Sequence, residues 1–127
     1  EPLVLVHGFG DSTYARHRNA AVLRDAGSRL ILADQPGLGR SGVPADGYVY
    51  SVENQAKAVF GLLTRLGIGR FRLIGHSMGG GIALYLGSRH PERVSRVAVI
   101  APACFRPACN FGIPGVNGGR SWLVTRL

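Results

Sequence analysis

Short apolar runs alternate with longer amphipathic stretches along most of this chain. Four of these runs have the length and composition of strands buried in a sheet: Leu3–Val6, Leu30–Ala33, Phe71–Ile74 and Val97–Ile100. Between them, residues with helical spacing predict helices over Tyr14–Ala26, Val52–Leu66 and Gly80–Arg89. Strands that alternate with helices in this way predict an α/β fold with a parallel sheet, formed as one domain.

The helix predicted after Tyr50 has the clearest boundary signals. Ser51 is a residue type that caps helix N-termini, and Gly67 stands where a left-handed residue often ends a helix. The apolar residues between them fall on one helix face: Val52, Ala56, Val59, Phe60, Leu63 and Leu66. Gly27 ends the preceding helix by the same logic.

A glycine-flanked serine lies between the third predicted strand and the third predicted helix. Residues 75–79 read GHSMG, so Gly75 and Gly79 stand two positions either side of Ser77. A sharp strand-to-helix turn needs residues without bulk at those positions, and the following helix directs its N–H groups toward developing negative charge. The pattern predicts a nucleophilic serine. The alternative is an ordinary glycine-rich connection, because the chain has 19 glycines.

A second motif follows the first predicted strand and favours the nucleophile. Residues 7–10 read HGFG directly after Leu3–Val6. Serine hydrolases with a G-x-S-x-G turn take one oxyanion donor from such a segment and the other from the residue after the serine. The backbone N–H groups of Phe9 and Met78 are therefore the predicted oxyanion hole, and Ser77 is the predicted catalytic nucleophile.

Together these motifs resemble those of the α/β-hydrolase superfamily, over residues 3 to about 102. Residues 5–10 match its oxyanion segment, residues 34–41 (DQPGLGRS) resemble its D-x-P-G-x-G-x-S loop, and residues 75–80 match its G-H-S-M-G-G elbow. Residues 90–94 (HPERV) resemble the segment that leaves the elbow helix. The resemblance also implies a strand order in which Leu3–Val6 and Phe71–Ile74 are central and the other two strands flank them.

The resemblance implies an enzyme that hydrolyses an ester, amide or related acyl bond of a small-molecule substrate, without a cofactor or a metal. A serine nucleophile argues against the epoxide hydrolases and haloalkane dehalogenases of the same fold, which use aspartate. Esterases, peptidases of small substrates, C–C bond hydrolases and cofactor-free haloperoxidases all remain open.

The order of a catalytic triad in this fold is serine, then an acid, then histidine. After Ser77 the chain offers only Glu92 and His90, which flank a proline at the end of the elbow helix. A helix rises about 1.5 Å per residue, which carries His90 away from Ser77, so we expect both to be surface residues. His76 adjoins the nucleophile but is expected to point elsewhere on the elbow and not to be the base. His7 is expected to have a structural or donor role in the oxyanion turn. The sequence therefore predicts a nucleophile and oxyanion donors without a general base.

The length of the chain and the composition of its final segment also indicate an incomplete catalytic site. The family fold usually needs about twice these 127 residues. We predict an N-terminal hydrolase core over residues 1–102 and an irregular tail over residues 103–127, where helical and strand periodicity is lost. The chain is thus expected to be truncated and catalytically incomplete. The alternatives are a non-enzymatic remnant of a hydrolase gene, a genuine short lid at the tail, or a basic binding module.

Charge and composition narrow the possible partners. The net charge of +8 comes almost entirely from arginine, but the arginines are scattered without the interleaved aromatic residues of a single-strand nucleic-acid binder. No apolar run approaches the length of a membrane helix. We therefore expect no nucleic-acid or membrane partner. Cys104 and Cys109 have no accompanying ligands for zinc and are predicted to be free thiols, consistent with a cytoplasmic location.

One glycine-rich loop motif resembles a dinucleotide-binding site but is predicted not to be one. Residues 37–42 spell G-x-G-x-x-G, yet Pro36 precedes them and Pro44 follows, so no helix can open there to receive a pyrophosphate. We predict a loop near the active-site mouth. Asp34 at its start precedes the serine, so it is predicted to accept hydrogen bonds from loop amides and not to act in catalysis.

Overall fold

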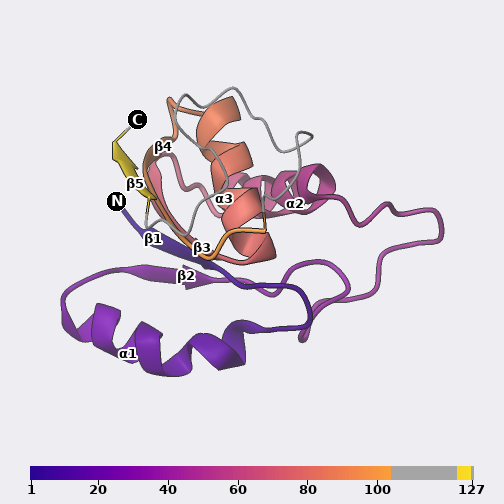
Figure 1. The fold of residues 1–127 in the computed structure, drawn as a ribbon, viewed down its shortest axis with the longest axis horizontal. Helices are drawn as coiled ribbons and strands as arrows, with labels where there is room; N and C mark the ends of the chain where they lie inside the picture. The colour runs from indigo at the N-terminus through magenta and orange to yellow at the C-terminus, as the bar shows by residue number, and fades with distance from the viewer. Residues whose placement is uncertain (104–122, 127) are drawn as a thin grey trace.

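A sheet of five strands forms the centre of the molecule in the computed structural model, which describes residues 1–103 and 123–126. The strands are β1 (Leu3–Val6), β2 (Leu30–Leu32), β3 (Phe71–His76), β4 (Val94–Ile100) and β5 (Leu123–Arg126), in the order β2-β1-β3-β4-β5 (Figure 1). The first four are parallel. The predicted α/β class, the parallel pairing and the central position of β1 and β3 are confirmed.

The fifth strand is a departure from the sequence prediction. β5 pairs antiparallel with β4, placing Val124 opposite Ala98, so β4 is not the sheet edge that the four-strand order implied. The predicted irregular tail over residues 103–127 is therefore wrong for residues 123–126, which form a strand. The sequence did not predict β5 because four residues are too few to show strand periodicity. The pairing arises because the open edge of β4 offers unpaired N–H and C=O groups to an extended segment. The rest of the predicted irregular tail, residues 104–122, lies outside the described residues.

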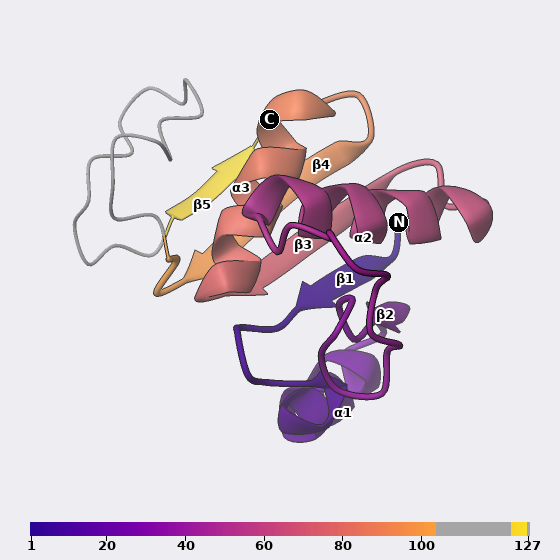
Figure 2. The same cartoon turned by 90° about the vertical axis from the view of Figure 1, so that its right-hand side faces the viewer.

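Helices cover the two faces of the sheet unequally. Figures 1 and 2 show α2 (Val52–Arg65) and α3 (Met78–Arg89) side by side on one face, and α1 (His17–Asp25) alone near β2 on the other. A short 3₁₀ turn, η1 (Thr13–Arg16), precedes α1, so this helix begins later than predicted. No residue of α1 is buried, whereas most of α3 is.

Alternation along β3 shows how the sheet divides these faces. Phe71 and Leu73 are almost fully buried and belong to the core beneath α2 and α3, whereas Arg72 and Ile74, on the alternate positions, are only partly buried. Because side chains alternate across a strand, the well-packed core lies on the α2–α3 side. The other side is packed mainly where α1 contacts it.

The boundaries of α2 follow the sequence signals. The Ser51 hydroxyl accepts a hydrogen bond from the Asn54 N–H at 3.1 Å, and Gly67 has a φ of +67°. Ala56, Val59 and Leu63 of the predicted apolar face are buried. Leu66 is an exception, since it is 54% exposed where the helix has already ended. No other helix begins between the G-x-G-x-x-G residues and Val52, so that segment is a loop, as predicted.

Candidate active site

Ser77 occupies a strained position between the end of β3 and the start of α3. Its φ of 53° and ψ of −120° put a non-glycine residue in a sparsely populated region, which costs about 1–3 kcal/mol. Neighbouring hydrogen bonds hold it there: the Ser77 N–H donates to the Ile100 carbonyl at 3.0 Å, and the Ser77 carbonyl accepts from the Ala103 N–H at 2.9 Å. This sharp turn is the geometry that the G-x-S-x-G spacing predicts.

The two glycines of the motif are required by close backbone contacts. A Cβ on Gly75 would overlap the carbonyl of Gly79, and a Cβ on Gly79 would overlap the carbonyl oxygens of Val6 and His7. The elbow therefore packs directly against the end of β1. That contact brings the HGFG segment and the serine together, although almost 70 residues separate them in the sequence.

The HGFG segment forms a tight turn beside the serine. The Asp11 N–H donates to the Gly8 carbonyl at 3.3 Å, and Gly10 has a φ of +70°, so Phe9 and Gly10 are the central residues of the turn. A Cβ on Gly8 would lie 3.2 Å from the Ser77 Cβ. Among the described residues, the N–H groups of Phe9 and Met78 have no hydrogen-bond acceptor. The HGFG turn and the start of α3 thus each offer one uncommitted donor near the serine.

His7 is fully engaged beneath this turn. Its side chain is 1% exposed, its Nδ1 donates to the Gly8 carbonyl at 2.8 Å, and its Nε2 accepts from the Gln35 N–H at 3.3 Å. A backbone N–H can only donate, so Nε2 accepts in this contact, and Asp34 Oδ1 lies 3.7 Å from the same nitrogen. The Gln35 side chain completes the link by donating to the His7 carbonyl at 2.8 Å. His7 is a structural residue, as expected.

Asp34 anchors the neighbouring loops, also as expected. Its carboxylate accepts hydrogen bonds from the N–H groups of Thr13 at 2.6 Å and Arg40 at 2.9 Å. Burial raises the pKa of Asp34, but the N–H groups of Arg40 and Thr13 favour the charged form more strongly, so the pKa lies below its ordinary value. Asp34 therefore ties the oxyanion loop to the loop that follows β2.

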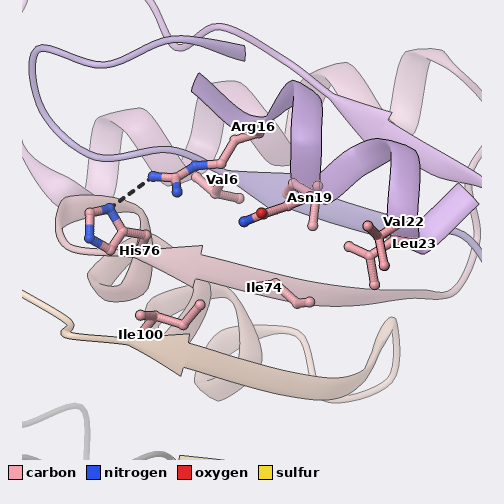
Figure 3. Close-up of a pocket in the computed structure, with 9 residues that line it drawn as sticks. Val6, Arg16, Asn19, Val22, Leu23, Ile74, His76 and Ile100 are labelled. Carbon is pink, nitrogen blue, oxygen red and sulfur yellow. Dashed lines mark hydrogen bonds between the residues drawn. The ribbon is translucent and has the colours of Figure 1, made fainter. Parts of the chain in front are cut away.

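None of the four histidines hydrogen-bonds to Ser77 in the part of the chain described. His17 contacts the Tyr14 carbonyl, and His90, at the far end of α3, stacks on Phe60 with 3.8 Å between ring centroids. His76 is adjacent to the serine, but its Nδ1 is 2.9 Å from the Arg16 guanidinium (Figure 3). The structure brings Ser77 together with two amides and does not place a general base beside it.

A pocket of about 310 Å³ lies on the α1 side of the sheet, at the carboxyl ends of the strands. Its lining is mostly apolar, with Arg16 and His76 at one end (Figure 3). The lining residues are Leu5, Val6, Arg16, Asn19, Val22, Leu23, Ile74, His76 and Ile100. Sequence reasoning missed Arg16. Its position beside the elbow results from the fold of the preceding loop, because Arg16 has no characteristic spacing from any motif.

The described residues contain no group of three or more His, Cys, Asp or Glu side chains that could hold a metal ion. Nor do these residues include a helix long and apolar enough to cross a bilayer.

A strained serine between a parallel strand and a helix, beside a turn with an unbonded amide, defines the nucleophile-elbow class of α/β proteins. The family model for the alpha/beta hydrolase fold matches residues 1–113. The chain belongs to this family. The match extends past residue 102, where the resemblance was expected to end.

Several of the chain's relatives are named as hydrolases. It is 39% identical to 2-hydroxymuconate semialdehyde hydrolase of Pseudomonas putida over 100 residues, which cover 78% of this chain and 35% of that protein. Among solved structures it is similar to a probable hydrolytic enzyme of Pseudomonas aeruginosa (34% identity, TM-score 0.78, 90% of this chain and 36% of the other). It also matches a marine microorganism esterase (31% identity, TM-score 0.71, 78% and 36%). The chain spans little more than a third of each.

Proposed function

We propose that this chain is the nucleophile-bearing part of a serine hydrolase that acts on an ester, amide or related acyl bond. The observation that carries the proposal is the strained backbone of Ser77 between two uncommitted amides, those of Phe9 and Met78. A strained turn of this kind is retained where a serine must stand clear of its neighbours at the end of a strand. The hydrolase names of the relatives support the same reaction class.

In the proposed mechanism the Ser77 hydroxyl attacks the substrate carbonyl carbon. The Phe9 and Met78 amides would hold the resulting oxyanion, and the positive end of the α3 dipole would stabilise it further. A general base must take the hydroxyl proton, and the chain's own histidines are engaged elsewhere. We propose that the base and its acid belong to a longer protein, since the relatives are almost three times as long as the matched region.

The substrate class follows from the relatives' names and from the site. One relative is named for 2-hydroxymuconate semialdehyde and another is an esterase, and both names fit attack at a small carbonyl compound. Simple esters are therefore the first class to test, with small keto compounds second. A nucleic-acid substrate has no support from the described site, which lies at the strand ends beside a mostly apolar pocket.

Selective modification of Ser77 tests the nucleophile without requiring a complete triad. Oxyanion stabilisation alone retains about 10³-fold catalysis in enzymes that lack a triad residue. A fluorophosphonate should therefore modify Ser77 faster than any other serine of the 127-residue chain, at mildly alkaline pH, as followed by peptide mass spectrometry. Ser77→Ala should lose that modification alone. Equal modification of Ser77 and the remaining serines would overturn the proposal.

A further inference from the structure

We infer that Arg16 is a positioning residue that fixes the spacing between the two proposed oxyanion donors. The inference rests on the function proposed above for Ser77. One nitrogen, Arg16 Nη2, donates to Asp11 Oδ2 at 2.9 Å and to His76 Nδ1 at 2.9 Å. Asp11 belongs to the turn that carries the Phe9 amide, and His76 immediately precedes Ser77 and Met78. A single guanidinium thus bridges the two halves of the site. Figure 3 shows its bond to His76.

At the Asp11 end of the Arg16 bridge, Asp11 controls the position of the Phe9 amide. Its N–H closes the turn onto the Gly8 carbonyl, and its Oδ1 accepts from the Ser12 N–H at 2.8 Å. Phe9 has no such anchor of its own, because its side chain is 78% exposed and its N–H is unbonded among the described residues. A displacement of Asp11 therefore moves the Phe9 amide directly.

At the His76 end of the bridge, the bond with Arg16 sets the tautomer of the imidazole ring. An arginine can only donate, so Nδ1 of His76 must accept and the ring proton must reside on Nε2. His76 is the last residue of β3 and pairs in register with Ile100 of β4, so its backbone is fixed by the sheet. Arg16 therefore ties the HGFG turn to the end of β3.

Partial burial distinguishes this bridge from an ordinary surface ion pair. The side chains of Arg16 and Asp11 are only 19% and 25% exposed, and the bridge joins segments 60 residues apart. Exposed pairs contribute little because water and salt screen them. The competing explanation is that Arg16 merely anchors η1, in which case its loss would weaken that turn without altering the serine or His76.

The tautomer of His76 provides a test that does not depend on activity. Long-range ¹H–¹⁵N correlation spectra of the full chain with ¹⁵N-labelled histidine should show His76 with a bare Nδ1. Arg16→Gln should give a mixture of both tautomers. Arg18→Gln, two residues away on an exposed position, should leave the spectrum unchanged. Magic-angle spinning on sedimented protein gives the same measurement if the chain is poorly soluble. A proton on Nδ1 in the unmodified chain would overturn the inference.

The reactivity of Ser77 provides the second test. Arg16→Gln should slow fluorophosphonate modification of Ser77 by about 10- to 100-fold, the scale of a donor misplaced by up to 1 Å. Arg16→Lys should restore part of the rate, and Arg18→Gln should have no effect. Asp11→Ala should slow modification while leaving the His76 tautomer intact, and it also serves if Arg16→Gln does not fold.

The two proposals fail in different ways. If Ser77 in the unmodified chain reacts no faster than other serines, the proposed function fails, whereas the His76 tautomer still reports on Arg16. If Ser77 reacts selectively and Arg16→Gln, with an unchanged circular dichroism spectrum, reacts at the same rate, the positioning role is wrong.

Discussion

The Ser77 N–H donates to the Ile100 carbonyl at 3.0 Å, so the elbow is fastened to the end of the neighbouring strand, β4. In addition, the Ala103 N–H donates a hydrogen bond to the Ser77 carbonyl at 2.9 Å. Together these bonds hold the left-handed backbone of the serine from the side opposite β1. The strain at Ser77 is thus maintained by two neighbouring segments, the end of β4 with the residues after it and the β1 end packed on Gly79.

Gly79→Ala should destabilise the fold, because the added methyl group would overlap the carbonyl oxygens at the end of β1. Overpacking of this kind costs about 1–3 kcal/mol in the free energy of unfolding. Gly61→Ala is the matched control. Gly61 lies within α2 with no atom near an added Cβ, so alanine there should stabilise by about 0.5–1 kcal/mol. Urea denaturation measures both changes, and a neutral Gly79→Ala would show that the elbow is looser than described.

The 127-residue chain should show no serine-dependent turnover of p-nitrophenyl esters above a Ser77→Ala control at neutral pH. Triad residues act as a unit, so a site without its base loses nearly all of its rate. The assay uses a large molar excess of ester over protein, so that repeated turnover can be distinguished from a single acylation of Ser77. A clear excess of turnover over Ser77→Ala would contradict this expectation and would direct attention to His90 or His7 as the base.

Sequence patterns were sufficient for features that are specified locally. Apolar runs located the four parallel strands, Ser51 and Gly67 marked the ends of α2, and the G-x-S-x-G spacing identified the strained serine. Each of these signals arises from a few neighbouring residues and from backbone sterics. The start of α3 at Met78, two residues earlier than predicted, follows from the same turn because Ser77 itself is the N-cap.

Features that depend on distant contacts were not predictable in this way. In the sequence, Arg16 is one of many scattered arginines. Its contact with His76 depends on how the turn at Phe9 and Gly10 folds, which no local pattern specifies. β5 has no period of its own, and its pairing depends on the free edge of β4. The catalytic role of Ser77 and the donor roles of Phe9 and Met78 stay predictions.

Asp34 should make the stability of the fold sensitive to acid. Burial opposes its charge, but the Arg40 and Thr13 N–H groups outweigh burial, so its folded pKa lies below the ordinary value of 3.8. A lowered folded pKa means that the unfolded chain binds the proton more readily. The contribution of Asp34 is therefore complete above about pH 4 and is lost as pH falls through the lower, folded pKa.

Urea midpoints between pH 2 and 6 for the unmodified chain and Asp34→Asn measure this contribution. The unmodified chain should be more stable at pH 6, and the difference between the two should shrink below about pH 4. Asp46→Asn is the control, because Asp46 lies in the exposed part of the same loop. A difference between Asp34→Asn and the unmodified chain that stays constant down to pH 2 would show that the ionised carboxylate does not stabilise the loops.

Removal of residues 123–127 should make the chain more prone to aggregation. β5 pairs with β4 along Arg96–Val99, and without it those backbone groups would form an open edge. Open edges recruit strands from other molecules, and β2 at the opposite end of the sheet is already such an edge. Light scattering at equal protein concentration should therefore rise faster for the chain ending at residue 122 than for one lacking Leu127 alone. Equal scattering from the two would mean that the pairing of β5 with β4 does not protect that edge.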